Sequence, residues 1–348
     1  MHVAPGWPLT AWIKEKSGEP ASLTAYLVSR RNGYVTGATV NADGGSDFWY
    51  AERAAAAPRT DLASLPLMGF IGDQVQRVRS LIPVRALPAL ARRRVDALWE
   101  NDEFRSAQEA EMRYLLENTD RAPEIPEIAR EYTEFALLRG YRRWHPGHLS
   151  RQPVTGIEWL TTKRDPERGV LLSFVHHAQY EGLFPSLARA GATVHTVVAP
   201  EAFDPASPIQ LRQHFKVAGM MPSTTLVPAT IGSAGMVELL EQRAVLAIAS
   251  DVAGRTPVQF MGRELRGSFG AARIATQTNS PVVLVTSHRS ADGSPSLQVH
   301  EPLEPGDFAS PADLLAEIMR RHEPAVLAWP AAFDSPYTRL GIPAGDEA

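Results

Sequence analysis

A histidine and a glutamate, His176 and Glu181, close an apolar run that reads GVLLSFVHHAQYEGLF from residue 169 to 184. Such a run is typical of a buried strand, and titratable groups are costly to bury unless they pair with something. Four residues separate the two, which lets the chain turn back and bring the carboxylate to the imidazole. A carboxylate bonded to one ring nitrogen leaves the other nitrogen able to take a proton from a hydroxyl. This HX4E spacing therefore predicts that His176 is a general base and that Glu181 orients it.

The same residues allow two other interpretations. His176 could be a hydrogen-bonded histidine at a strand end that caps the next helix, beside a surface Glu181. His176, His177 and Glu181 could instead bind a metal ion, although no further cluster of ligand residues supports this. Neighbouring strand residues alternate between faces, so we expect His177 to point away from His176 and to take no part in the chemistry.

Composition limits the chemistry further. The 348 residues contain no cysteine, which excludes disulfides, thiolate nucleophiles and cysteine-based metal sites. The formal net charge is −4, so nothing in the overall balance indicates binding to DNA or another polyanion. No uninterrupted apolar stretch has the roughly 18 to 20 residues that a membrane span needs, and no signal peptide pattern opens the chain. We expect a cytoplasmic protein that does not span the membrane.

The second half of the chain, residues 151–348, alternates short apolar runs with helical stretches. The runs GVLLSFVH, ATVHTVVAP, AVLAIASD and PVVLVTSH predict buried strands, with helices expected around 180–190, 209–218, 233–242 and 268–278. Such alternation predicts an α/β fold with a central, largely parallel sheet flanked by helices. Functional groups gather at the carboxyl ends of the strands in such a sheet, which is where His176 lies.

A helical lead-in is expected over residues 56–150, where apolar residues recur at helical spacing. We expect Pro83 and Pro88 to interrupt its first helical stretch, and Pro126 to lie in a first helical turn. Arginines share the first stretch with Leu, Ile and Val, at positions 77, 79, 85, 92, 93 and 94. This combination is compatible with reversible contact with an anionic membrane surface, on the inner face of the membrane, although most such faces are simply solvated.

The region around His176 resembles a known family. The segment VTGIEWLTTKRDPERGVLLSFVHHAQYE is similar to the first motif of the lysophospholipid acyltransferase superfamily, in the branch of bacterial lipid A late acyltransferases and phosphatidylinositol mannoside acyltransferases. That branch typically has HxGNWE where this chain has His176 through Glu181, so Ala178, Gln179 and Tyr180 replace Gly, Asn and Trp. The resemblance implies a glycerolipid acyltransferase-like fold, with residues 56–348 forming the acyltransferase domain.

The resemblance extends downstream, over roughly residues 75–335. SAGMVELLEQRAVLAIASDVAGRTPVQFMGRELRGSFGAARIATQTNSPVVLVTSHR follows the family's order of helix, strand ending in Asp, polar loop, FFG-like element, helix and strand. HEPAVLAWPAAF resembles its terminal element, with Leu327 in place of a tryptophan. It implies substrate-binding roles for residues at matching positions: Asp251, Arg255, Phe260, Gly262 and Arg263. For the two arginines the resemblance leaves open a phosphate-binding role or a surface salt bridge.

The mechanism that the resemblance implies needs no cofactor, because an acyl thioester is a co-substrate. His176 would activate an acceptor hydroxyl or amine, which attacks the thioester carbonyl directly, and backbone N–H groups of the following helix could stabilise the oxyanion. The partners are then an acyl donor (CoA or a carrier protein) and a hydroxyl-bearing acceptor, which the resemblance predicts to be a lipid or glycolipid. A soluble acyltransferase of a small-molecule pathway, using acyl-CoA, acyl carrier protein or aminoacyl-tRNA, is an alternative. An inactive lipid- or partner-binding module is a third interpretation, which the retained His176 and Glu181 disfavour.

Residues 1–55 form a separate appendage in this interpretation. Within it, about residues 21–48 resemble the last strand and tail of short-chain dehydrogenases, with a YVTG segment followed by a strand and DGG. No glycine-rich nucleotide loop and no Tyr–Lys pair precede this tail, so it carries no dehydrogenase chemistry. We expect residues 1–55 to be dispensable for turnover.

Overall fold

The computed structural model describes residues 79–340. Their strands form a seven-stranded sheet in the order β1-β9-β8-β2-β5-β3-β4. Every neighbouring pair is parallel except β8 and β9, which are antiparallel. The strands are β1 (Val154–Thr155), β2 (Val170–Phe174), β3 (Val194–Val198), β4 (Thr224–Pro228), β5 (Val245–Ala249), β8 (Val282–Arg289) and β9 (Pro295–Val299). The predicted α/β fold with a largely parallel sheet flanked by helices is confirmed.

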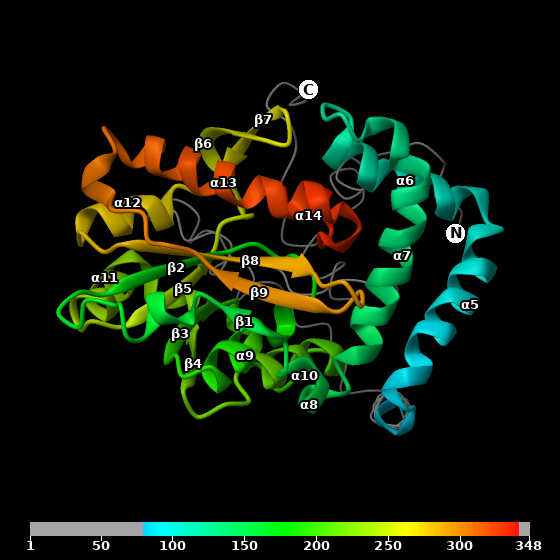
Figure 1. Cartoon of the computed structure of the whole chain (residues 1–348), viewed down its shortest axis with the longest axis horizontal. Helices are drawn as coiled ribbons and strands as arrows, with labels where there is room; N and C mark the ends of the chain where they lie inside the picture. The colour runs from blue at the N-terminus through cyan, green and yellow to red at the C-terminus, as the bar shows by residue number, and fades with distance from the viewer. Residues whose placement is uncertain (1–78, 341–348) are drawn as a thin grey trace.

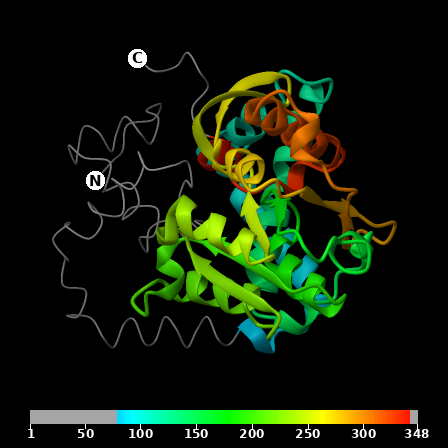
Figure 2. The ribbon, with the colours of Figure 1, turned by 90° about the vertical axis from the view of Figure 1, so that its left-hand side faces the viewer.

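Helices cover both faces of this sheet, which explains why the residues of β2 and β5 are buried throughout. Leu171 and Leu246 face the core cluster that includes residues of α12 (Gly270–Gln277) and α13 (Pro311–Ala328). The next residue of each strand, Leu172 or Ala247, faces the opposite cluster with α9 (Leu183–Arg189) and α10 (Ile209–Ala218). Figure 1 shows α13 on one side of the strands and α9 and α10 on the other. The view turned by 90° again places α13 above the strands (Figure 2).

The helical lead-in stands at one end of the sheet, and the arrow of β8 points toward it (Figure 1). It consists of α5 (Leu87–Trp99), α6 (Asp102–Leu116), α7 (Ile125–Arg142) and the short α8 (Pro146–Leu149). The remaining helices are α11 (Gly232–Glu241) and α14 (Pro336–Leu340), and β6 (Ala253–Phe260) pairs with β7 (Arg263–Gly267) in a separate antiparallel hairpin. The lead-in therefore places α7 next to the carboxyl ends of the parallel strands.

Most predicted elements are found near their expected positions. The helix expected over 209–218 is α10, and Pro126 lies in the first turn of α7. Pro88 is a correction: it lies in the first turn of α5 and begins that helix instead of interrupting it, because a first-turn residue needs no backbone N–H partner. The dehydrogenase-like segment, the boundary at residue 56 and Arg77 lie outside the described residues.

The segment that follows α13, Trp329–Leu340, packs against the loop after β2. The N–H of Ala178 donates to the carbonyl of Ala332, and the N–H of Asp334 donates to the carbonyl of His176. His177 forms an antiparallel bridge with Phe333. This return of the chain fixes the backbone of the loop that begins at His176.

Candidate active site

His176 and Asp251 form a pair at the carboxyl ends of two neighbouring strands. Their strands, β2 and β5, are in parallel register with Phe174 opposite Ala249, and each of the two residues lies two positions further on. Nδ1 of His176 is 2.8 Å from Oδ1 of Asp251, and the backbone N–H of His176 donates to Oδ2 at 2.7 Å. The register of two strands thus holds both oxygens of the carboxylate against one histidine.

Burial and charge set the protonation states of this pair. Burial raises the pKa of Asp251, but the charge and hydrogen bonds of His176, together with Arg339, outweigh it and leave that pKa below its usual value. Burial lowers the pKa of His176, with a further decrease from Arg339, although Asp251 opposes both. The imidazole is therefore neutral near pH 7. Because an ionised carboxylate only accepts, Nδ1 carries the proton, and Nε2 is the nitrogen left to accept one.

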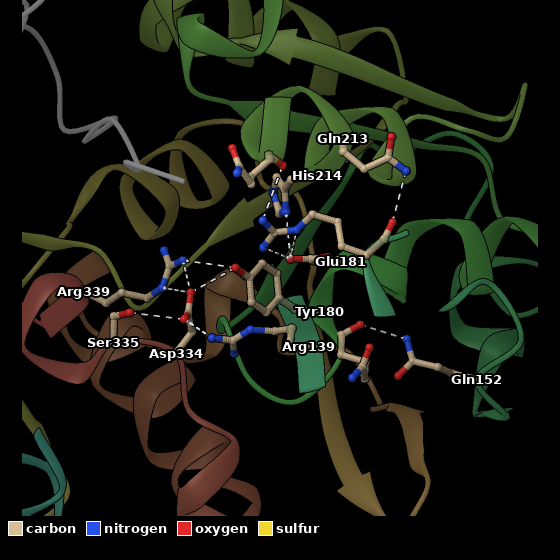
Figure 3. A network of polar contacts seen from close by, with 12 residues as sticks. Arg139, Gln152, Tyr180, Glu181, Gln213, His214, Asp334, Ser335 and Arg339 are labelled. Carbon is tan, nitrogen blue, oxygen red and sulfur yellow. Dashed lines mark hydrogen bonds and ion pairs between the residues drawn. The ribbon is translucent and has the colours of Figure 1, made fainter. Parts of the chain in front are cut away.

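Glu181 does not make the contact with His176 that the sequence predicted. It lies in the 3-10 turn Tyr180–Gly182, where its Oε1 accepts from Arg143 at 3.0 Å (Nε) and 2.5 Å (Nη2). Nδ1 of His214, on α10, is 3.3 Å from the same oxygen (Figure 3). The buried carboxylate has its pKa lowered to about 2 because Arg143 and His214 outweigh the effect of burial. Asp251, and not Glu181, contacts Nδ1 of His176, because the turn after His177 carries Glu181 toward α7 and α10.

A second buried charge cluster lies beside this one. Asp334 accepts from Arg339 at 2.5 Å and from the hydroxyl of Tyr180 at 2.9 Å, and it also pairs with Arg139 on α7 (Figure 3). The side chains of both arginines and of Asp334 are almost completely buried. The cluster joins α7, the His176 loop and the Trp329–Leu340 segment, so it holds the wall of the site together.

Removal of the Asp334 charge should destabilise the protein strongly. Asp334→Ala leaves Arg139 and Arg339 buried without their shared partner, which should lower the free energy of unfolding by about 3–5 kcal/mol. Urea unfolding followed by circular dichroism measures this, with the exposed Asp307→Ala as the control that should change little. The pKa of Asp334 is depressed in the folded protein, so its contribution is present above its unfolded pKa near 3.8 and is lost as the pH falls through the folded value. An unchanged unfolding midpoint for Asp334→Ala would contradict this role.

An apolar cavity lies in front of His176, between the carboxyl ends of β2, β3 and β5 and the helices α9 and α10. Its apolar lining includes Phe174, Phe184, Val198, Phe215, Ile248 and Val252. Its polar lining consists of His176, Tyr180, Glu181, Thr196, His214, Ser268 and Arg339. The general-base candidate therefore faces an apolar space with a few polar groups, which is the usual character of a small-molecule site.

The other residues expected to bind substrate lie away from this cavity. Arg255, Phe260, Gly262 and Arg263 belong to the β6–β7 hairpin, and the cavity lining includes none of them. Phe260 is fully buried in the core, and Gly262, at φ +73°, turns the hairpin where a Cβ would meet the Asn118 carbonyl. The guanidinium of Arg263 pairs with Glu117 at 2.5 Å, and Arg255 is exposed. Of the five residues expected to bind substrate, only Asp251 lies next to His176. The other four lie on the hairpin, which leads the chain toward α6.

His177 points away from the cavity, as expected. Its Nε2 lies 2.8 Å from the carbonyl oxygen of Trp329, and burial lowers its pKa to about 4. Among residues 79–340 no group of three or more His, Asp or Glu side chains is arranged to hold a metal ion.

Sequence reasoning missed the buried partners Arg139, Arg143, His214, Asp334 and Arg339. Arg139 lies in the last turn of α7 and Arg143 is the C-cap residue four positions further on, but nothing in this spacing distinguishes them from a solvated pair. Asp334 directly follows the WPAAF segment, which resembles the terminal element of the family. That proximity was the available signal for a functional residue there.

Comparison with known proteins identifies no family. No protein-family model and no curated protein matches the chain. The chain is similar in structure to the 1-acyl-sn-glycerophosphate (LPA) acyltransferase PlsC from Thermotoga maritima, with 15% sequence identity and a TM-score of 0.34, over 73% of this chain and 97% of that chain. In the part of the chain that the structure describes, every helix is too short or too polar to cross a membrane.

Proposed function

We propose that the protein is an acyltransferase that moves an acyl group from a thioester, or a similarly activated ester, to a hydroxyl or amine. The observation that carries this proposal is the His176–Asp251 pair, which presents one ring nitrogen of a neutral, buried imidazole to an apolar cavity. The resemblance of the segment around His176 to the lysophospholipid acyltransferase superfamily supports the same chemistry.

The reaction follows from the protonation states of the pair. Nε2 of His176 takes the proton of the acceptor while the acceptor oxygen or nitrogen forms a bond to the acyl carbonyl carbon. The positive charge that develops on the imidazole is stabilised by Asp251. The intermediate then collapses, the bond to sulfur breaks, and the imidazolium returns the proton to the leaving thiolate. Arg339, which also lines the cavity, contributes positive charge near the developing oxyanion.

An assay of thiol release tests this function. The full-length protein is mixed with acyl-CoA or acyl carrier protein donors of several chain lengths and with hydroxyl- or amine-bearing acceptors. Acceptor-dependent release of free thiol, together with an acylated acceptor seen by mass spectrometry, is the expected result. Thiol release that is unaffected by removal of the His176 side chain would contradict the proposal.

A lipid acceptor would bring the protein to a membrane surface, and α5 has the residues for such contact. Arg92, Arg93 and Arg94 are exposed on this helix beside the partly exposed Leu90, and Leu81 precedes them with 77% of its surface exposed. Each arginine that reaches an anionic headgroup layer adds about 1 kcal/mol of binding, which weakens as salt rises. We therefore place the protein on the inner face of the membrane as a peripheral protein when its acceptor is a lipid.

Cosedimentation with vesicles that contain phosphatidylserine measures this association. We expect binding at low salt that is reversed at high salt, and weaker binding when Arg92, Arg93 and Arg94 are all replaced by glutamine. Vesicles of neutral lipid are the control. The absence of binding at both salt concentrations would favour a soluble small-molecule acceptor, and binding that resists salt would contradict the electrostatic explanation.

A further inference from the structure

Ser268 lines the cavity with a hydroxyl that the protein does not use. The residue is only 8% exposed, and its backbone N–H donates at 3.0 Å to the carbonyl of Val252, which also lines the cavity. Its Oγ makes no hydrogen bond within residues 79–340, yet this atom keeps surface that a small molecule can reach. A hydroxyl held in this way is available to a ligand, because no group in the described chain competes for it.

This hydroxyl lies at the same edge of the sheet as the pair that carries the chemistry. Val252 directly follows Asp251, and Asp251 contacts His176 through both carboxylate oxygens. The β6–β7 hairpin leaves this edge after Val252 and returns to it at Gly267, which pairs with Ala253. Ser268 is the next residue, so the hairpin brings a polar side chain back to the cavity that His176 lines.

The helix that begins directly after this segment places positive potential behind the hydroxyl. The N–H groups of Gly270, Ala271 and Ala272, at the start of α12, find no acceptor among the described residues, and no side chain caps the helix. All three residues are buried. Unpaired N–H groups at a helix start are equivalent to about half a positive elementary charge. The start of α12 therefore favours a negative charge that develops next to Ser268.

A negative charge in this cavity needs such support. In the proposed reaction the acyl carbonyl oxygen becomes an anion while the acceptor bonds to the carbonyl carbon. The ionised Asp251 belongs to the same site, and a second negative charge near it is disfavoured by repulsion. The guanidinium of Arg339 supplies positive charge, but its Nε and Nη2 already donate to Asp334. The hydroxyl of Ser268 is a donor that no such partner occupies.

We propose that Ser268 is a catalytic residue that donates a hydrogen bond to the oxyanion, and that the dipole of α12 stabilises the same charge. The proposal rests on the proposed function and extends it by assigning the oxyanion-binding site. The acceptor forms a bond to the carbonyl carbon, the carbonyl electron pair moves to oxygen, and the acceptor proton goes to Nε2 of His176. Ser268 keeps its own proton and forms no bond to the acyl group. The electron pair returns when the bond to sulfur breaks.

Kinetics of a serine variant test this assignment. Ser268→Ala should lower kcat by about 100-fold with little change in KM, because an oxyanion donor stabilises the transition state more than the bound substrate. The acid limb of the pH profile should not move, since His176 and Asp251 are unchanged. Ser268→Thr keeps a hydroxyl and should recover part of the loss. Ser207→Ala is the matched control, because Ser207 is likewise 8% exposed but lies outside the cavity lining.

A second measurement does not depend on turnover. Analogues of acetyl-CoA and octanoyl-CoA with CH₂ in place of sulfur keep the carbonyl and cannot release a thiol. With ¹³C at that carbonyl, NMR of the full-length protein should show a downfield shift on binding, which a hydrogen bond to the carbonyl oxygen produces. We expect a smaller shift with Ser268→Ala and the wild-type shift with Ser207→Ala.

Three results would overturn the proposal. They are wild-type kcat in a folded Ser268→Ala protein, equal carbonyl shifts in that variant and the wild type, and an acyl group attached to Ser268 after incubation with the donor alone. Mass spectrometry detects the last, which would make the hydroxyl a nucleophile. Wild-type turnover in Ser268→Ala beside an inactive His176→Ala would remove only this inference. Thiol release that His176→Ala does not affect would contradict the proposed function instead.

Discussion

Replacement of His176 by alanine should lower the rate of acyl transfer by about 100- to 10,000-fold, which is the usual contribution of a general base. The side chain makes its one described hydrogen bond with Asp251, so the fold should survive its removal. Turnover measured by thiol release, together with a thermal melt, checks both points. His148→Ala is the matched control, because His148 is exposed and lies outside the cavity. A folded His176→Ala protein with wild-type turnover would refute the assignment.

The pH dependence of the reaction gives an independent test of the same residue. The imidazole must be neutral to accept a proton, and burial lowers its pKa below the usual 6.5. Activity should therefore stay constant as the pH falls to about 6.5 and decline only below it. The acid limb of the kcat/KM profile measures this. A decline that begins well above pH 6.5 would show that another group controls the rate.

Asp251→Asn should reduce turnover by about 100-fold or more, because it changes which ring nitrogen of His176 carries the proton. Oδ2 of Asp251 accepts from the backbone N–H of His176, and in the variant the amide oxygen would keep that contact. The amide NH₂ would then face Nδ1 and donate to it, which places the imidazole proton on Nε2. Such an imidazole has no lone pair directed at the acceptor.

Heteronuclear NMR of the His176 ring measures directly which tautomer is present in each protein. We expect Nδ1–H in the wild type and Nε2–H in Asp251→Asn, with similar melting temperatures. Asp307→Asn, at an exposed site, serves as the control. Full activity in a variant whose tautomer has changed would remove Asp251 from the mechanism.

Four strands of the sheet, β2, β3, β5 and β8, were predictable from their apolar runs because both faces of the sheet are covered, whereas β1, β4 and β9 were not expected from the sequence. Strands buried on two faces are continuous apolar runs, such as the residues of β2 and β5, and these stand out in a sequence. The hairpin of β6 and β7 was not predicted as strands, since β6 has polar and exposed residues such as Arg255 and Gln259. The local pattern therefore identifies the core of the fold better than its periphery.

The site was predictable only in part. The position of His176 after a buried run was readable from the sequence, but its partner depends on the register of β2 against β5, and Asp251 is 75 residues away. The four-residue spacing favoured Glu181 instead. The backbone between the two turns sharply at Ala178, which has φ 55°, a conformation that glycine adopts more readily. Glycine is the residue that the resembling family usually has there, so the loop keeps the turn despite the change to alanine.

The pairing of Arg139 with Asp334 also constrains how the protein can be made. The two residues are 195 positions apart, and at about 5–20 residues per second a ribosome needs about 10–40 s to pass from one to the other. By the end of that interval the nascent chain contains α7 and the strands β2 and β5, but it still lacks the carboxylate that neutralises Arg139 and the segment that supports the His176 loop. Co-translational folding must then leave the mouth of the cavity unfinished while the sheet assembles, and the last docking step creates the active arrangement.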